Sequence, residues 1–150
     1  MFLITSVRIV GWYTHGIWSS PLLWCFFVAL AFIALGFLLF ALQSALTLSP
    51  FLSVHAFAVG TIGIMTAGMM ARVSTGHTGR SLKAPAKLLS PSLLLLALAA
   101  VVRVLLPPLS PDHYSLWINL SAVLWICAYS GLTICFLSVW TSPRVDGKYG

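Results

Sequence analysis

The sequence predicts an all-α integral membrane protein in which residues 1–150 form one domain with four transmembrane helices. Of the 150 residues, 60% are hydrophobic and only 7% are charged, and a chain of this composition would aggregate in water. A helix needs about 20 apolar residues to cross the hydrocarbon core of a bilayer. Four runs come near this length, each bounded by proline, glycine or polar residues: 21–42, 50–72, 91–106 and 114–140.

The segment before the first run mixes aromatic and polar residues. Residues 7–18 contain Trp12, Tyr13 and Trp18 together with Arg8 and His15. Because tryptophan and tyrosine rings favour the membrane–water boundary, we expect this segment to lie along the cytoplasmic interface. The first run lacks a basic cluster directly before it and is too long for the apolar part of an ordinary secretory signal, so it is interpreted as a span.

The basic residues predict the orientation of the spans, because cytoplasmic loops collect Lys and Arg. If the four spans alternate in direction, seven of the eight basic residues fall on one side: Arg8, Arg72, Arg80, Lys83, Lys87, Arg144 and Lys148. Only Arg103 lies toward the other side. Both termini and the 72–91 loop are therefore predicted to be cytoplasmic. This distribution accounts for the net charge of +6, and no nucleic-acid partner is expected.

Two groups of residues are expected to serve packing inside the membrane. Small residues in the second run either let neighbouring helices approach closely or leave room for a flat cofactor, and close packing is favoured: Gly60, Gly63, Ala67, Gly68 and Ala71. The three cysteines lie inside the runs at no spacing typical of a metal cluster, so buried thiols are expected: Cys25, Cys127 and Cys135.

The four histidines are the first candidates for metal ligands, and the predicted topology separates them. His15 and His77 fall toward the cytoplasm, whereas His55 and His113 fall toward the opposite face. His55 and His77 lie 22 positions apart, about 33 Å in a continuous helix at ~1.5 Å per residue. One subunit therefore cannot easily bring both to one metal. If both are ligands, two sites are expected, one at each face.

His55 lies one turn inside the second run, where an ionisable group is a functional candidate by default. Neutral imidazole is a standard ligand of haem iron and copper, and the alternative is a hydrogen-bonded structural histidine. Arg103 stands near the same face on the third run, where it would either neutralise a haem propionate or extend to the interface. His113 is a candidate second axial ligand, although an ordinary loop position is favoured, and His15 is a weaker candidate ligand.

A second cluster lies at the cytoplasmic end of the same run, where His77 stands between two glycines and close to Arg72 and Arg80. Glycine permits positive φ and leaves the imidazole uncrowded, while arginine supplies fixed positive charge for an anionic group. The cluster would suit a second metal, haem propionates or lipid headgroups. Met65 and Met69 share a helical face, and their thioethers suit Cu(I), although packing is the commoner role of such residues.

Carboxylates are almost absent from the chain. Asp112 and Asp146 are the only two, and they fall on opposite sides of the predicted membrane. A pair of carboxylates for acid–base catalysis is therefore excluded. Any chemistry would have to be carried by a metal or a cofactor.

The second run and the loop after it closely resemble the signature of the NnrS family. The segments that carry the resemblance are 55–66 (HAFAVGTIGIMT), 70–74 (MARVS) and 76–80 (GHTGR), with further likeness at 21–24, 103–105, 124–125 and 143–147. Members of this family are bacterial inner-membrane proteins associated with nitric oxide and described as containing haem and copper. Familiar members are several times longer, and this chain resembles their last four spans. They also carry a histidine where this chain has Phe26 and Phe27, so a bis-histidine site on the first two helices does not carry over.

The resemblance implies haem b, with copper as a second candidate, in a bacterial inner-membrane protein that acts on nitric oxide. Two functions stay open. In the first, a redox protein reduces or removes nitric oxide, with an electron donor still unknown. There His55 is the leading iron ligand and His77 binds a second metal, while Arg72, Arg80 and Arg103 neutralise propionates or oxyanions. In the second, the same ligands serve a non-catalytic sensor, carrier or scaffold against nitrosative stress. A unit without neighbouring spans exposes packing surfaces, so a dimer or trimer is expected.

Overall fold

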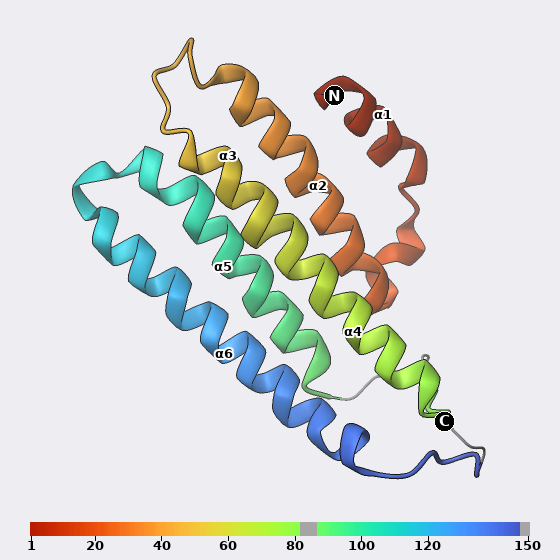
Figure 1. Ribbon diagram of the computed structural model, residues 1–150. Helices are drawn as coiled ribbons and strands as arrows, with labels where there is room; N and C mark the ends of the chain where they lie inside the picture. Colours follow the sequence, from red (N-terminus) through yellow and green to blue (C-terminus); the bar gives the residue numbers. More distant parts are fainter. Residues whose placement is uncertain (82–86, 148–150) are drawn as a thin grey trace.

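The computed structural model describes residues 1–81 and 87–147, and the regular elements in these residues are all helices (Figure 1). Four helices are long and apolar enough to cross a membrane: α2 (Pro21–Leu42), the continuous helix Phe51–His77, α5 (Leu89–Leu109) and the helix Pro111–Thr141, most of which is α6 (Tyr114–Thr141). The predicted all-α fold with four candidate membrane spans is confirmed.

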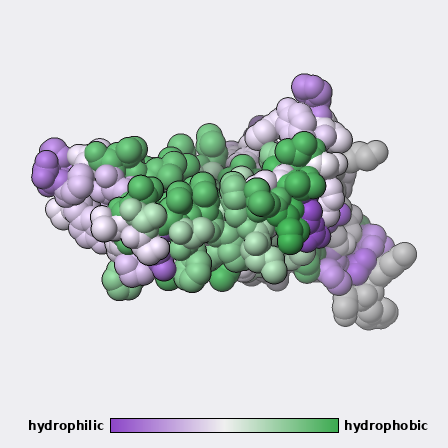
Figure 2. Space-filling model, turned by 90° about the horizontal axis from the view of Figure 1, so that it is seen from above, coloured by the Kyte–Doolittle hydropathy of each residue, from purple (hydrophilic) through white to green (hydrophobic). Residues whose placement is uncertain are grey.

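The four long helices lie side by side and alternate in direction (Figure 1). Each helix packs against its neighbour in sequence, α2 also contacts α5, and the second long helix also contacts α6. Buried apolar side chains from all four helices form one core, with Phe32 from α2, Ile64 from the second long helix, Leu96 from α5 and Phe136 from α6 among them. Figure 2 shows an apolar surface over the middle of the molecule with hydrophilic residues toward both ends, the pattern expected for a bilayer protein.

The second long helix is continuous but changes its winding. It consists of α3 (Phe51–His55), the π-helical segment η2 (Ala56–Gly63) and α4 (Ile64–His77). In a π-helix each turn is wider, and such segments often mark functional sites. Two hydrogen bonds hold this segment to its neighbours: the Thr61 hydroxyl donates to the Ala29 carbonyl (3.4 Å), and the Tyr129 hydroxyl donates to the Gly63 carbonyl (3.3 Å).

Three of the predicted helix boundaries need correction, because each helix is longer than its apolar run. The second continues past residue 72 to His77, so His77 is the last helical residue and not a loop residue. The third includes Pro107 and Pro108, which remove only the hydrogen bonds to the carbonyls of residues 103 and 104 in its last turn. The fourth reaches Thr141, one residue beyond the predicted end.

The N-terminal segment also differs from the prediction. Helix α1 (Phe2–Trp12) is followed by the short 3-10 helix η1 (His15–Ser19), and α1 folds back alongside α2 instead of lying across its end (Figure 1). Its few polar groups are satisfied locally: the Thr5 and Ser6 hydroxyls donate to carbonyls one turn back, and Arg8 stacks over Trp12 at 5.4 Å. The half-buried residues of α1 are Phe2, Thr5, Ser6 and Ile9, and none is fully buried, so α1 lies alongside α2 without entering the core. As a result Met1 lies away from the end of the bundle at which α4 ends, and the compartment that each end faces stays a prediction.

The small residues of the second long helix pack against α2, as expected. A Cβ on Gly60 would lie 2.3 Å from ring atoms of Phe32, and one on Gly68 would lie 2.6 Å from the Cys25 Sγ. These positions are filled by neighbouring side chains and leave no room there for a flat cofactor. The expectation of three buried thiols holds only for Cys25, because Cys127 is exposed and Cys135 is half-buried; all three are free.

Gly60→Ala should destabilise the protein by about 1–3 kcal/mol, the usual effect of overpacking, because the added methyl meets Phe32. Gly76→Ala is the matched control, since a Cβ on Gly76 meets nothing within 4 Å. Thermal unfolding of the detergent-purified variants checks this prediction, and Gly76→Ala should keep or raise the wild-type Tm. Equal Tm values for the two variants would contradict the packing assigned to Gly60.

Candidate functional site

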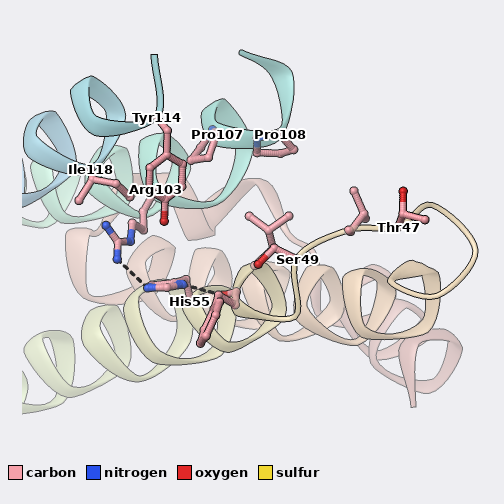
Figure 3. A pocket seen from close by; sticks show the side chains of 11 residues that line it. Thr47, Ser49, His55, Arg103, Pro107, Pro108, Tyr114 and Ile118 are labelled. Atoms are coloured by element: carbon pink, nitrogen blue, oxygen red, sulfur yellow. Dashed lines mark hydrogen bonds between the residues drawn. The ribbon is translucent and has the colours of Figure 1, made fainter. Parts of the chain in front are cut away.

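The candidate site is centred on His55, which ends α3 at the point where the π-helical segment begins. Its ring nitrogen Nδ1 lies 2.5 Å from the Phe51 carbonyl oxygen, one turn earlier in the same helix. Its other nitrogen, Nε2, lies 2.8 Å from Nη2 of Arg103 on α5. The half-buried imidazole is therefore held at both nitrogens, once by its own helix and once by the neighbouring helix (Figure 3).

These two contacts determine the tautomer of His55. A guanidinium has only donors, so Nε2 must accept the hydrogen bond from Arg103 and cannot carry a proton. The proton then sits on Nδ1, which donates to the Phe51 carbonyl. The imidazole is neutral, and its Nε2 lone pair points away from its own helix toward Arg103. Metal-ligating histidines share one half of this arrangement, since one of their nitrogens donates to a carbonyl while the other coordinates the metal; here that other nitrogen accepts from Arg103.

Arg103 has no carboxylate partner within residues 1–81 and 87–147. The only ion pair among the described residues is that of Arg144 with Asp146, and the Asp146 carboxylate packs against Gly79, beyond the far end of α4. The other carboxylate, Asp112, lies in the short 3-10 helix η3 (Pro111–His113). A positive charge within a membrane-spanning helix is expensive unless it is paired. The Arg103 guanidinium is therefore suited to an anionic group that enters the site.

Two cavities flank the hydrogen-bonded pair. One, of about 300 Å³, lies toward the end of the bundle, and its lining includes Thr47, Ser49 and Tyr114 (Figure 3). The other, of about 460 Å³, lies along α6, and its lining includes Ser121 and Trp125. His55, Arg103 and Ile118 line both cavities. Sites for small molecules and cofactors have volumes of about 300–1,000 Å³, so either cavity falls within this range.

Sequence reasoning brought His55 and Arg103 together but missed the hydroxyl-bearing residues around them. Thr47 and Ser49 come from the α2–α3 connection and Tyr114 from the start of α6, and no local pattern marks them. His113 precedes Tyr114 but does not line either cavity. Its Nδ1 is 3.1 Å from the Ser110 hydroxyl and its ring contacts Trp117. It lies in the short helix directly before α6 and not in a loop, and its role stays a prediction.

The predicted residues of the second cluster lie at the other end of the same helix. His77 is exposed and lines a cleft of about 380 Å³ with Arg72 and Met69 on α4 and with Arg144 from the C-terminal tail. Arg80 does not line this cleft, and its Nη1 is buried without a hydrogen-bond partner. The helix between His55 and His77 is continuous, so the two histidines lie at opposite ends of one span. The π-helical segment η2 rises less per residue than an α-helix, so their separation is shorter than the predicted value of about 33 Å, which assumed ~1.5 Å per residue throughout.

Gly79, two residues after His77, ends α4 in a Schellman motif. Gly79 has φ of +72°, the N–H of Arg80 donates to the Thr75 carbonyl (3.1 Å), and the N–H of Gly79 donates to the Gly76 carbonyl (3.2 Å). A Cβ at Gly79 would also lie 2.9 Å from the Asp146 side chain. Glycine is needed here both for its backbone conformation and for the close approach of the tail.

The C-terminal tail is tied to this helix end. The Val145 N–H donates to the Thr78 carbonyl (3.2 Å), and Arg144 donates to both carboxylate oxygens of Asp146 (2.9 and 2.6 Å). The hydrogen bonds to Asp146 raise the pKa of Arg144 above its usual value, so the guanidinium keeps its charge. Arg144, which the sequence did not single out as a site residue, thus joins Arg72 and His77.

The remaining candidate ligands are dispersed. Met65 is half-buried against the core, Met69 is half-exposed in the His77 cleft, and His15 contacts the Tyr13 ring in the N-terminal segment. Within residues 1–81 and 87–147, no three His, Cys, Asp or Glu side chains come together in a way that could hold a metal ion. Lys83 and Lys148, which belong to the predicted cytoplasmic charge, lie outside the described residues.

Comparison with known proteins identifies the family. The family model described as "NnrS protein" matches residues 1–144. The chain belongs to the NnrS family. Neither the curated proteins nor the solved structures contain a match to the chain. Membership in the NnrS family implies a membrane protein related to nitric oxide, and the four apolar helices agree with it.

The segments that carry the NnrS resemblance gather at the two ends of the second long helix. Residues 55–66 and 103–105 provide His55 and Arg103 at one end. Residues 76–80 and 143–147 provide the capped helix end and the tail that binds it at the other. Two stretches 63 or more residues apart in sequence (from residue 80 to residue 143) therefore form one structural unit around His77.

Gly79→Ala should loosen this unit. An L-residue with positive φ costs about 1–2 kcal/mol, and its Cβ would displace Asp146 as well. Trypsin should then cleave after Arg144 faster than in the wild type, as measured by mass spectrometry of the detergent-purified protein. Gly76→Ala lacks both penalties and serves as the control. Unchanged cleavage in Gly79→Ala would show that the tail is held by other contacts.

Proposed function

We propose that this protein is a haem-containing bacterial inner-membrane protein of nitric oxide metabolism in which His55 would bind the iron. One observation carries the proposal: at the wall of two cavities, the unprotonated Nε2 of His55 is paired with Arg103, which has no carboxylate partner among the described residues. When bound, haem would supply an iron that binds nitric oxide and accepts or donates electrons. The chain's own residues hold and position this group.

The residues around His55 fit a haem with its anionic propionates. The Phe51 carbonyl holds the imidazole in the tautomer that leaves Nε2 free of a proton. Arg103 donates a hydrogen bond to Nε2, so a metal can bind this nitrogen only after that hydrogen bond is broken. A propionate offers Arg103 a charged acceptor in exchange for a neutral one, and charge-assisted hydrogen bonds are the stronger kind.

Catalysis or capture of nitric oxide is favoured over a fully coordinated site. Neither cavity has a second histidine, a methionine or a cysteine among its lining residues. Tyr114 is the other lining residue of a type that ligates haem iron. A site with one strong ligand leaves a coordination position for a diatomic ligand. Because nitric oxide is small and apolar, it can reach this site from the bilayer.

The proposal rests on haem, and copper has weaker support. His77 and Met69 share a cleft, but they are its only ligand types and two arginines stand beside them. The sensor or carrier function differs from nitric oxide reduction only in whether turnover follows binding. The homo-oligomer stays a prediction.

His55→Ala should abolish the Soret band of the purified protein, because no other histidine lines the cavities. His55→Gln is the sharper variant, since the side-chain amide still offers Arg103 an acceptor but does not replace the imidazole as iron ligand. His113→Ala is the control and should keep the band. Absorption spectra with and without nitric oxide, together with iron analysis, check this. A normal spectrum in His55→Gln would show that His55 is not the ligand.

Arg103→Leu should lower haem retention by about tenfold or more, the effect of losing one hydrogen bond to a charged group. Leucine is favourable within a span, so a loss of haem would not reflect poor membrane insertion. Arg103→Lys should retain an intermediate amount, because the charge remains while the planar donor pair is lost. Haem-to-protein ratios after detergent washing measure this effect. An unchanged ratio in Arg103→Leu would leave Arg103 with no role in holding the cofactor.

A further inference from the structure

The cleft at the far end of α4 carries a second inference, independent of haem at His55. Its lining combines three nitrogen-bearing side chains with two apolar ones and a glycine: Met69, Arg72, Val73, Gly76, His77 and Arg144. The basic residues come from two separate segments, since Arg144 belongs to the tail that crosses the end of α4. The hydrogen bond from Val145 to Thr78 and the contact of Asp146 with Gly79 hold the tail in place.

The charges of the cleft favour an anion over a metal ion. Arg72 and Arg144 are permanently charged, and no carboxylate lines the cleft. Asp146 neutralises part of the charge of Arg144, but it binds from the side of Gly79 and does not line the cleft. A metal cation would be repelled by both guanidinium groups and would find only His77 and Met69 as ligands. An anion would instead meet the guanidinium fork of Arg72, the N–H donors of Arg144 that Asp146 does not take, and the imidazole of His77.

Most carbonyl groups at the end of the helix already accept hydrogen bonds and do not face an anion unpaired. The carbonyls of Thr75 and Gly76 accept backbone hydrogen bonds in the Schellman motif, and the Thr78 carbonyl accepts one from the tail. The Ser74 carbonyl accepts a hydrogen bond from the Thr78 hydroxyl (2.6 Å). Hydrogen bonds to these carbonyl groups weaken the partial negative charge at the C-terminal end of the helix. The net charge of the cleft is therefore set mainly by the two arginines.

The position of the cleft points to a lipid. Met69 and Val73 are 50% and 45% exposed, and they continue the apolar surface of the span up to the charged groups. Trp140 lies at the same level, where its indole N–H donates to the Ser74 hydroxyl (2.9 Å), and tryptophan favours the depth of lipid headgroups. We propose that this cleft binds the phosphate headgroup of an anionic phospholipid through Arg72 and Arg144, with the acyl chains along Met69 and Val73.

The test is a lipid titration of the detergent-purified full chain, with the Tm as the readout. Phosphatidylglycerol should raise the Tm in a saturable manner, and phosphatidylcholine should not. Arg72→Gln should shift the half-maximal lipid concentration by about tenfold or more, as expected for loss of a charged hydrogen-bonding group. Arg72 is exposed, so this substitution leaves the core intact. Lys87→Gln is the matched control, because Lys87 is an exposed cation at the same end of the bundle that does not line the cleft.

Three results would overturn the proposal. Equal stabilisation by phosphatidylglycerol and phosphatidylcholine would remove the headgroup specificity. If Arg72→Gln and Lys87→Gln raised the half-maximal lipid concentration equally, the lipid would be bound by general surface charge and not by the cleft. If inorganic phosphate at matched concentration gave the same Tm shift, the ligand of the cleft would be a soluble anion and not a lipid. Lipid binding and the Soret band are separate measurements, so a failure here is distinguishable from failure of the haem proposal.

Discussion

Arg103 imposes the constraint on which the candidate site depends, because a guanidinium within a membrane span must find a partner. Translocon measurements put an arginine at a span centre at about 2.5–3.5 kcal/mol unfavourable. The chain holds only two carboxylates, and both lie outside the long apolar part of the spans, so the arginine is paired with a neutral acceptor, His55. That pairing fixes the imidazole tautomer and holds the start of the second span against the end of the third. It also leaves an uncompensated charge at the wall of two cavities.

The continuous helix from Phe51 to His77 explains why the two histidine clusters are separate. Its π-helical segment begins directly after His55 and changes the winding without breaking the chain. Within that segment, Gly60 admits the Phe32 ring and Thr61 reaches the backbone of α2, so α2 packs closely on a wide turn. The site at His55 therefore rests on a rigid support, while the far end of the helix is free to serve a different ligand.

The sequence predicted the features that depend on local composition and failed for those that depend on contacts between distant segments. Apolar runs located the four spans, and their alternation placed Arg103 on the side of His55. The extension of α4 to His77 was missed because the residues Ser74, Thr75 and Gly76 have modest helix propensity. The tail's contact with Thr78 and the antiparallel packing of α1 on α2 depend on tertiary structure. No pattern of residue types specifies the π-helical winding.

The two ends of the second span use arginine in opposite ways, and this difference separates their functions. At the His55 end, Arg103 has a neutral partner, and in the proposed haem site it would exchange this partner for an anionic propionate, an exchange that apolar surroundings favour. At the His77 end, Arg144 already forms a bidentate ion pair with Asp146. This pair fixes the orientation of the guanidinium and neutralises part of its charge. An exchangeable partner suits the loading of a cofactor. A fixed pair beside a second arginine suits recognition of a headgroup at the membrane surface, where binding requires no rearrangement of the protein.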